Sequence, residues 1–89
     1  MSDGAYVRLN VTVSDVWDTV TVTASPTTAL GGVKAEALEE ALGRRPDPTA
    51  YLLKYRGAEV LDESRTVGDL GIGSGAPLIV LPRHRRPVW

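Results

Sequence analysis

The residues best suited to chemistry or binding in this 89-residue chain gather in its last seven positions, which read RHRRPVW. Three of them are arginines, Arg83, Arg85 and Arg86, and the last residue is Trp89. Arginines can contact phosphates while a tryptophan stacks on a base, so nucleic-acid binding is one interpretation. A solvated strand end is a second. We favour a third, in which this segment docks Trp89 on a protein partner or on the domain's own sheet, since Trp and Arg are frequent interface anchors.

The sequence offers no catalytic or metal-binding constellation around this segment. His84 is the only histidine and the chain has no cysteine, so neither a nucleophilic triad nor a zinc site can be assembled. Asp62, Glu63 and Asp69 lie in expected turns, where carboxylates usually cap backbone N–H groups. The segment GIGSG suggests a phosphate-binding loop, but a strand rather than a helix is expected after it. We therefore predict a protein that is not an enzyme and that uses no metal and no cofactor.

The composition indicates one small soluble domain. Hydrophobic residues make up 43% of the chain and charged residues 24%, proportions typical of a globular protein. The net charge is −1, so nucleic acid is a disfavoured partner. No apolar run approaches the ~20 residues of a membrane span, and the start MSDGAY lacks the features of a signal peptide. We expect a cytoplasmic protein that is a monomer or a weak homo-oligomer.

Two stretches of alternating residues near the N-terminus predict a β-hairpin. Apolar and polar residues alternate in residues 5–13, and the alternation resumes in residues 19–24. A period of two is typical of half-buried strands, and the link SDVWD between them is rich in turn residues. The tip of this hairpin carries Trp17, which is either an exposed contact residue or packed against the hairpin. The expected inward positions are Val7, Leu9, Val11, Val13, Val20, Val22 and Ala24.

A helix is predicted from Leu30, where the apolar period changes to three and four residues. Gly43 stands where a left-handed C-cap belongs, and Pro46 prevents continuation of the helix. The expected buried face comprises Leu30, Val33, Ala37, Leu38, Ala41 and Leu42.

The start of this helix is less regular. Ser25, Thr27 and Thr28 precede it and are candidate caps. Gly31 and Gly32 weaken its first turn, because glycine costs about 1 kcal/mol relative to alanine within a helix. We attribute the two glycines to close packing of the helix against the sheet.

Three further strands are expected in residues 50–56, 58–62 and 77–82. In the first of them Leu53 and Tyr55 face inward and Leu52, Lys54 and Arg56 face outward. In the last, Leu78 and Val80 share one face and Ile79 and Leu81 share the other. The order β-β-α-β-β-β predicts an α+β fold in which one helix covers one face of a mixed sheet. We expect the domain to span residues 5–83, between a flexible N-terminus at 1–4 and a basic, aromatic tail at 84–89.

This order and these loops resemble the ubiquitin-like β-grasp proteins. The similar block is YLLKYRGAEVLDESRTVGDLGIGSGAPLIVL, which corresponds to the ubiquitin run from the third strand to the fifth. The segment SPTTALGGVKAEAL is similar to the end of the second strand and the helix of ubiquitin. The resemblance covers residues 5 to about 83 and implies the ubiquitin-like fold.

The resemblance fails at the positions used for conjugation. Ubiquitin and related sulfur carriers expose a diglycine whose carboxylate enters a narrow channel and is activated there. The corresponding residues here are Arg86 and Pro87, and Val88 and Trp89 follow. This departure argues against a covalent modifier or sulfur carrier activated at its C-terminus, which stays the alternative from a different functional class.

The segment VGDLGIGSGAPLIVL resembles a bacterial group of ubiquitin-like proteins without a diglycine, the YukD/EsaB accessories of type VII secretion. That resemblance implies a protein that binds partner proteins, such as components of a secretion machine, without being conjugated to them. A small nucleic-acid-binding adaptor is a further alternative.

The predicted binding site lies on the solvent face of the sheet. Ubiquitin carries there a hydrophobic patch whose central isoleucine corresponds to Lys54 in this sequence. The flanking outward positions Leu52, Ile79 and Leu81 are apolar, and clustered exposed apolar residues often mark a contact site. We predict that a partner binds these four residues together with Arg83, Arg85, Arg86 and Trp89. The alternative is that the tail folds back over the apolar residues.

Overall fold

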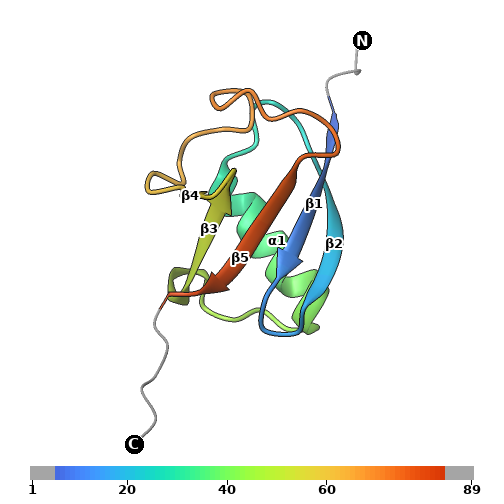
Figure 1. The fold of residues 1–89 in the computed structure, drawn as a ribbon, viewed down its shortest axis with the longest axis vertical. Coiled ribbons are helices and arrows are strands. Elements are labelled where there is room, and N and C mark those ends of the chain that lie inside the picture. The colour runs from blue at the N-terminus through green and yellow to red at the C-terminus, as the bar shows by residue number, and fades with distance from the viewer. Residues whose placement is uncertain (1–5, 84–89) are drawn as a thin grey trace, which may run out of the picture.

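The computed structural model describes residues 6–83 and folds them into five strands, one α-helix and one short 3₁₀-helix (Figure 1). The proposed segments 1–4 and 84–89 lie outside the described residues. The elements are β1 (Val7–Val13), β2 (Asp18–Ala24), α1 (Leu30–Leu42), the 3₁₀-helix η1 (Pro48–Ala50), β3 (Tyr51–Tyr55), β4 (Ala58–Glu59) and β5 (Pro77–Pro82).

The strands form one mixed sheet in the order β2-β1-β5-β3-β4. β1 pairs in parallel with β5 at the centre, while the β1–β2, β3–β5 and β3–β4 pairs are antiparallel. α1 crosses one face of this sheet and leaves the other face uncovered within the described residues (Figure 1). The architecture therefore consists of two layers, with the core between the helix and the sheet.

The alternation in the sequence places the core as predicted. Leu9, Val11 and Val13 of β1 are buried, and so are Leu53 of β3 and Val80 of β5. In α1 the predicted face is buried along its first half, whereas Ala41 and Leu42 are only partly covered. The buried apolar residues are Leu9, Val11, Val13, Val22, Ala24, Leu30, Val33, Ala37, Leu38, Tyr51, Leu53, Val67, Ile72, Leu78 and Val80.

The predicted side-chain caps of α1 are wrong. The N-cap residue is Ala29, which makes no side-chain cap hydrogen bond. The first N–H groups of the helix donate instead to a loop far along the chain: Leu30 to the carbonyl of Arg65 and Gly31 to that of Glu63, each at 2.9 Å. The capping acceptors thus come from tertiary structure, which no local pattern could reveal. The predicted C-cap is confirmed, because Gly43 is left-handed with φ of 71°.

The prediction that the helix glycines pack against the sheet is also wrong for Gly31. A methyl group placed on Gly31 would meet the side chain and carbonyl of Glu63, at 3.5 Å. Gly31 therefore faces the loop that caps the helix.

The fourth strand is shorter than expected. β4 comprises only Ala58 and Glu59, although Val60 still donates a backbone hydrogen bond to Leu53 at 2.8 Å. The chain then turns at Asp62, whose carboxylate accepts hydrogen bonds from the backbone and hydroxyl of Ser64 and has its pKa lowered by them. Asp62 thus caps a turn, as predicted, and that turn ends the strand.

The glycine-rich loop is a turn, in agreement with the sequence. Gly71 and Gly75 have φ of 65° and 85°, which only glycine adopts readily. The N–H of Gly75 donates to the carbonyl of Arg8 at 2.7 Å, so the end of the loop is bonded to β1 just before β5 begins. Within residues 6–83, no helix combines the length and hydrophobicity that a bilayer crossing requires.

Candidate protein-binding site

The uncovered face of the sheet has a polar half and an apolar half. Threonines at positions 19, 21 and 23 of β2 are exposed there, as are Arg8 and Asn10 of β1. β5 and β3 present mainly aliphatic side chains to the same face. The boundary runs between β1 and β5, where Thr12 lies beside Ile79.

The structure brings together the four predicted sheet residues. Leu52 of β3 lies directly opposite Leu81 of β5, and Lys54 lies opposite Ile79. Cross-strand neighbours in an antiparallel pair have side chains on the same face and in contact range. Ile79 is 43% exposed, and Leu52 and Leu81 are half-buried. The predicted alternation of β3 and β5 is therefore confirmed.

Trp17 joins this cluster from the hairpin turn. Its backbone φ is 50°, a left-handed conformation that is uncommon for a bulky residue, and its side chain is 79% exposed. Trp17, Lys54, Ile79 and Leu81 line one open groove of about 500 Å³, together with Ser14, Asp15 and Pro82. Of the two interpretations of Trp17, packing against the hairpin is therefore wrong, and a contact with a partner stays a prediction. We define the sheet-face patch as Trp17, Leu52, Lys54, Ile79 and Leu81.

Lys54 is the cation of the sheet-face patch. Glu59 of β4 lies directly opposite it in the sheet, but the carboxylate of Glu59 pairs with the guanidinium of Arg83 at 3.0 Å. Within residues 6–83 no carboxylate lies at ion-pair distance from Lys54. The patch therefore combines apolar surface with one positive charge that no carboxylate of residues 6–83 neutralises.

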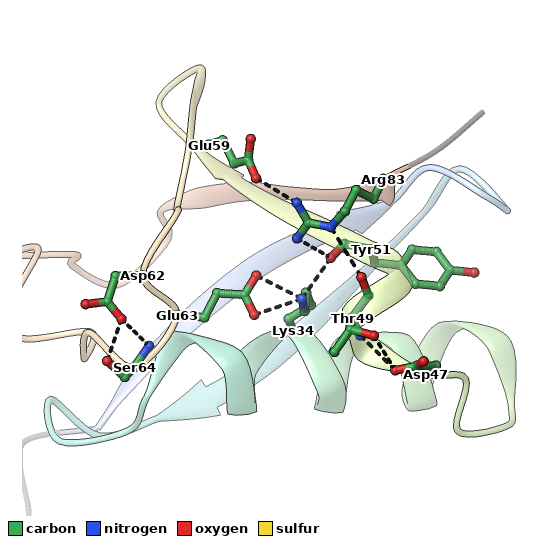
Figure 2. Close-up of polar contacts among 9 residues, drawn as sticks. All are labelled: Lys34, Asp47, Thr49, Tyr51, Glu59, Asp62, Glu63, Ser64 and Arg83. Carbon is green, nitrogen blue, oxygen red and sulfur yellow. Dashed lines mark hydrogen bonds and ion pairs between the residues drawn. The ribbon is translucent and has the colours of Figure 1, made fainter.

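Arg83 fixes the end of β5 to the start of β3 (Figure 2). Its guanidinium donates to the carbonyls of Thr49 and Tyr51, each at 3.2 Å, and its backbone N–H donates to Ala50 at 2.8 Å. With the Glu59 contact, these bonds occupy the side chain within the domain. Arg83 thus lies beyond the patch rather than in it.

The other predicted tail residues, Arg85, Arg86 and Trp89, lie outside the described residues, as does His84.

One polar residue of the groove was missed by the sequence analysis. Asp15 accepts a 2.6 Å hydrogen bond from the hydroxyl of Tyr51. This bond raises the pKa of Tyr51 above its ordinary value of 10.0, with further contributions from burial and from the negative charge of Asp15. The only signal in the sequence was an acidic residue in a turn, which gives no hint of a partner 36 residues away.

The hydrogen bond between Tyr51 and Asp15 predicts a stability that depends on pH. The native state holds the Tyr51 phenol protonated, so the bond stabilises the fold at neutral pH, and this contribution is lost as pH rises through the raised pKa. In Asp15→Asn we expect the pKa of Tyr51 to fall toward 10.0, measured from the ring carbon chemical shift between about pH 8 and 12. Asp18→Asn, at the start of β2 just after the same turn, is the control and should leave the titration of Tyr51 unchanged. An unaltered Tyr51 titration in Asp15→Asn would contradict the assignment.

Lys34 forms a buried ion pair on the other side of the sheet (Figure 2). Its ammonium group lies 2.8 Å from both carboxylate oxygens of Glu63 and 2.8 Å from the carbonyl of Tyr51. The lysine side chain is 2% exposed. All three of its protons thus have acceptors, which marks a structural rather than a reactive lysine. In the described part of the chain no three acidic or histidine side chains gather in a way that could hold a metal.

Comparison with solved structures identifies the fold. A designed protein based on ubiquitin has a TM-score of 0.74 at 20% identity, covering 98% of this chain and 100% of that chain. Ubiquitin of Caldiarchaeum subterraneum has a TM-score of 0.75 at 14% identity, over 92% and 99% of the two chains. A ubiquitin-like domain of an Arabidopsis thaliana protein has a TM-score of 0.75 at 16% identity, over 100% and 89%. The predicted α+β ubiquitin-like β-grasp fold is thereby confirmed.

Sequence comparison places the chain in a family. No curated protein matches it. The model of the family described as Protein of Unknown function (DUF2604) matches residues 4–81. Because that match spans most of the sequence, the chain belongs to the DUF2604 family, and it has the ubiquitin-like fold.

Proposed function

We propose that this protein is a ubiquitin-like interaction module that binds a partner protein through the sheet-face patch. The observation that carries the proposal is the cross-strand cluster of Leu52, Leu81 and Ile79 beside an exposed Trp17 and beside Lys54, which has no ion-pair partner among residues 6–83. Apolar residues gathered on the open face of an antiparallel sheet are typical of contact sites. The fold supports a non-enzymatic role, because ubiquitin-like domains typically act by binding other proteins.

The chemistry of the sheet-face patch supports one class of partner. The groove beside Trp17 offers apolar walls, so it suits an aliphatic or aromatic side chain. Lys54 lies in the same groove, and Asp15 already accepts a hydrogen bond from Tyr51. An apolar side chain flanked by a carboxylate therefore fits best, with the carboxylate paired to Lys54. Burying three aliphatic side chains contributes roughly 1.5–3 kcal/mol each, which the cost of association, about 4–15 kcal/mol, largely offsets. We expect weak binding unless contact between the partner and Trp17 adds to it.

The experiment is a selection of peptide ligands from a random display library against the purified domain. Ligands of the patch should be enriched in an aromatic or aliphatic residue next to Asp or Glu. The triple variant Leu52→Ser, Ile79→Ser, Leu81→Ser should lose at least about tenfold in affinity for them, because the contact area disappears. Lys54→Glu should lose a similar factor through charge reversal. Both variants should keep the circular dichroism spectrum of the folded domain.

The matched control carries serine on the polar half of the same face, as Arg8→Ser, Asn10→Ser and Thr23→Ser. It should bind the selected peptides like the wild type. Peptides that bind the triple variant as well as the wild-type protein, or that are enriched in basic residues, would contradict the proposal.

A more specific role follows from the sequence of the glycine-rich loop and β5. VGDLGIGSGAPLIVL resembles the YukD-like proteins, which supports an accessory role in a bacterial secretion machine, in the cytoplasm. A photo-crosslinking residue introduced at Ile79 in cells tests this role. A crosslink to a component of a secretion system supports it. A crosslink to an unrelated protein would overturn the secretion role but leave the sheet-face patch as the binding site.

A further inference from the structure

β2 is a long edge strand of the sheet, and within residues 6–83 no other strand pairs with its outer side. The sheet order leaves β2 at one edge and β4 at the other, and β4 has only two residues. β2 has seven residues, DTVTVTA, and Asp18 is its only charged residue. Edge strands are usually blunted by lysine, proline, bulges or short length, because their open backbone groups pair readily with another strand. β2 has none of these features.

The register shows which backbone groups of β2 face outward. The N–H of Asn10 donates to Ala76, and the carbonyl of Arg8 accepts from Gly75, so the even residues of β1 are directed toward β5. The odd residues of β1 then bond to β2, and their partners there are residues 18, 20, 22 and 24. The N–H and C=O groups of Thr19, Thr21 and Thr23 consequently face away from the sheet. Within residues 6–83 none of these groups has a hydrogen-bond partner.

The sequence of this edge is a palindrome. Residues 19–23 read Thr-Val-Thr-Val-Thr in both directions. A two-fold axis through Thr21 therefore sets each residue opposite its own kind in a second, antiparallel copy of the strand. Thr21 meets Thr21, Val20 meets Val22, and Thr19 meets Thr23.

We propose that two copies of this chain associate by antiparallel pairing of their β2 strands about Thr21, which joins the two sheets into one. The outward groups of Thr19, Thr21 and Thr23 then bond to Thr23, Thr21 and Thr19 of the second copy, so that every one of them gains a partner. Val20, which is half-buried on the helix side, gains an apolar neighbour in the second copy. Asp18 lies opposite Ala24, so no like charges face each other along the strands.

A second copy fits this edge better than an unrelated strand because only a second copy has the matching palindrome. A pairing of one strand with one strand buries less than the ~1,200 Å² of a standard complex, which predicts a weak dimer.

The test uses charges at the two-fold axis. Sedimentation equilibrium of the wild type, from about 20 µM to 1 mM, should show a reversible dimer. Thr21→Lys and Thr21→Glu should each weaken this dimer at least about tenfold, because each variant sets two like charges directly opposite. An equimolar mixture of the two variants should associate at least as well as the wild type. Only a register that sets residue 21 against itself gives this pattern.

The matched control is Thr23→Lys, which makes the same substitution on the same face of the same strand. In the proposed register its ammonium group meets the neutral Thr19, so the dimer should weaken by no more than a few-fold. Amide hydrogen exchange gives a second measurement. The amides of Thr19, Thr21 and Thr23 should gain protection as the concentration rises, whereas those of Val20 and Val22 are protected at every concentration by their bonds to β1.

Two results would overturn the proposal. The first is a wild-type protein that stays monomeric up to 1 mM with exchange at Thr19, Thr21 and Thr23 independent of concentration. The second is a dimer that Thr21→Lys leaves intact, since that dimer uses another surface. The residues of the sheet-face patch come from β3, β5 and the β1–β2 turn, and none of them belongs to β2, so either result leaves the proposed function untouched.

Discussion

Glu63→Ala is expected to destabilise the domain by about 3–5 kcal/mol, a large fraction of the roughly 5–15 kcal/mol that holds a small domain together. The carboxylate of Glu63 provides two of the three acceptors around the buried ammonium group of Lys34. Its removal leaves a charge that is 2% exposed with one carbonyl as its partner. An uncompensated buried charge is among the most costly changes a core can suffer.

Lys34→Met should cost much less, about 1–2 kcal/mol. Methionine fills a similar volume and suits an apolar site. The carbonyl of Tyr51 keeps its hydrogen bond from Arg83 at 3.2 Å, and Glu63, whose side chain is 23% exposed, can be hydrated. The double variant should resemble Lys34→Met alone, since no buried charge remains.

Urea denaturation of the wild type, Glu63→Ala, Lys34→Met and the double variant measures their four free energies of unfolding. Together they complete a double-mutant cycle for the pair of Lys34 and Glu63. Glu36→Ala, an exposed glutamate on the same helix, is the control and should change the stability by less than about 0.5 kcal/mol. Equal losses in Glu63→Ala and Lys34→Met would show that the loop contacts of Glu63, rather than the buried charge, carry the stability.

The contrast between local and distant interactions explains how much of the fold the sequence could predict. Alternation in β1 and β2 and the helical period from Leu30 depend on neighbours within a few residues, and both were predicted. The capping of α1 by the carbonyls of Glu63 and Arg65 links segments some thirty residues apart. The same loop supplies the partner of Lys34. Pairings of this kind depend on the closed tertiary structure, so local pattern and propensity cannot reveal them.

The residues of the candidate site also fall into those that a local pattern predicts and those that depend on tertiary structure. The two-residue alternation of the strands was enough to predict that Leu52 and Lys54 share one face of the sheet. The same holds for Ile79 and Leu81. The addition of Trp17 required the left-handed turn at the hairpin tip, and a bulky residue there runs against local preference. The contacts of Arg83 with Glu59 and two carbonyls, which the register of β5 against β3 makes possible, had no signal in the sequence, and its contact with a partner stays a prediction. That register is a property of the sheet, not of the arginine-rich segment.

Leu53→Ala is the second large effect, with an expected loss of about 3 kcal/mol within the 2–5 kcal/mol range of such substitutions. Leu53 is fully buried in β3, where it faces α1 and lies beside Val80 of β5. Truncation removes apolar contacts from the centre of the core and leaves a cavity that the rigid sheet cannot close.

Leu52, the preceding residue of β3, provides the matched comparison for Leu53→Ala. Leu52→Ala removes the same atoms from the same strand, but its side chain lies half-buried on the uncovered face, so the loss should stay below about 1 kcal/mol. Thermal and urea denaturation of the two variants measures the difference. Comparable losses would mean that the face carrying Leu52 is itself covered, as it would be if another part of the chain packs on it. A small loss for Leu52→Ala, combined with weaker binding of the selected peptides, separates what the two faces of β3 do: one stabilises the domain, and the other is available to a partner.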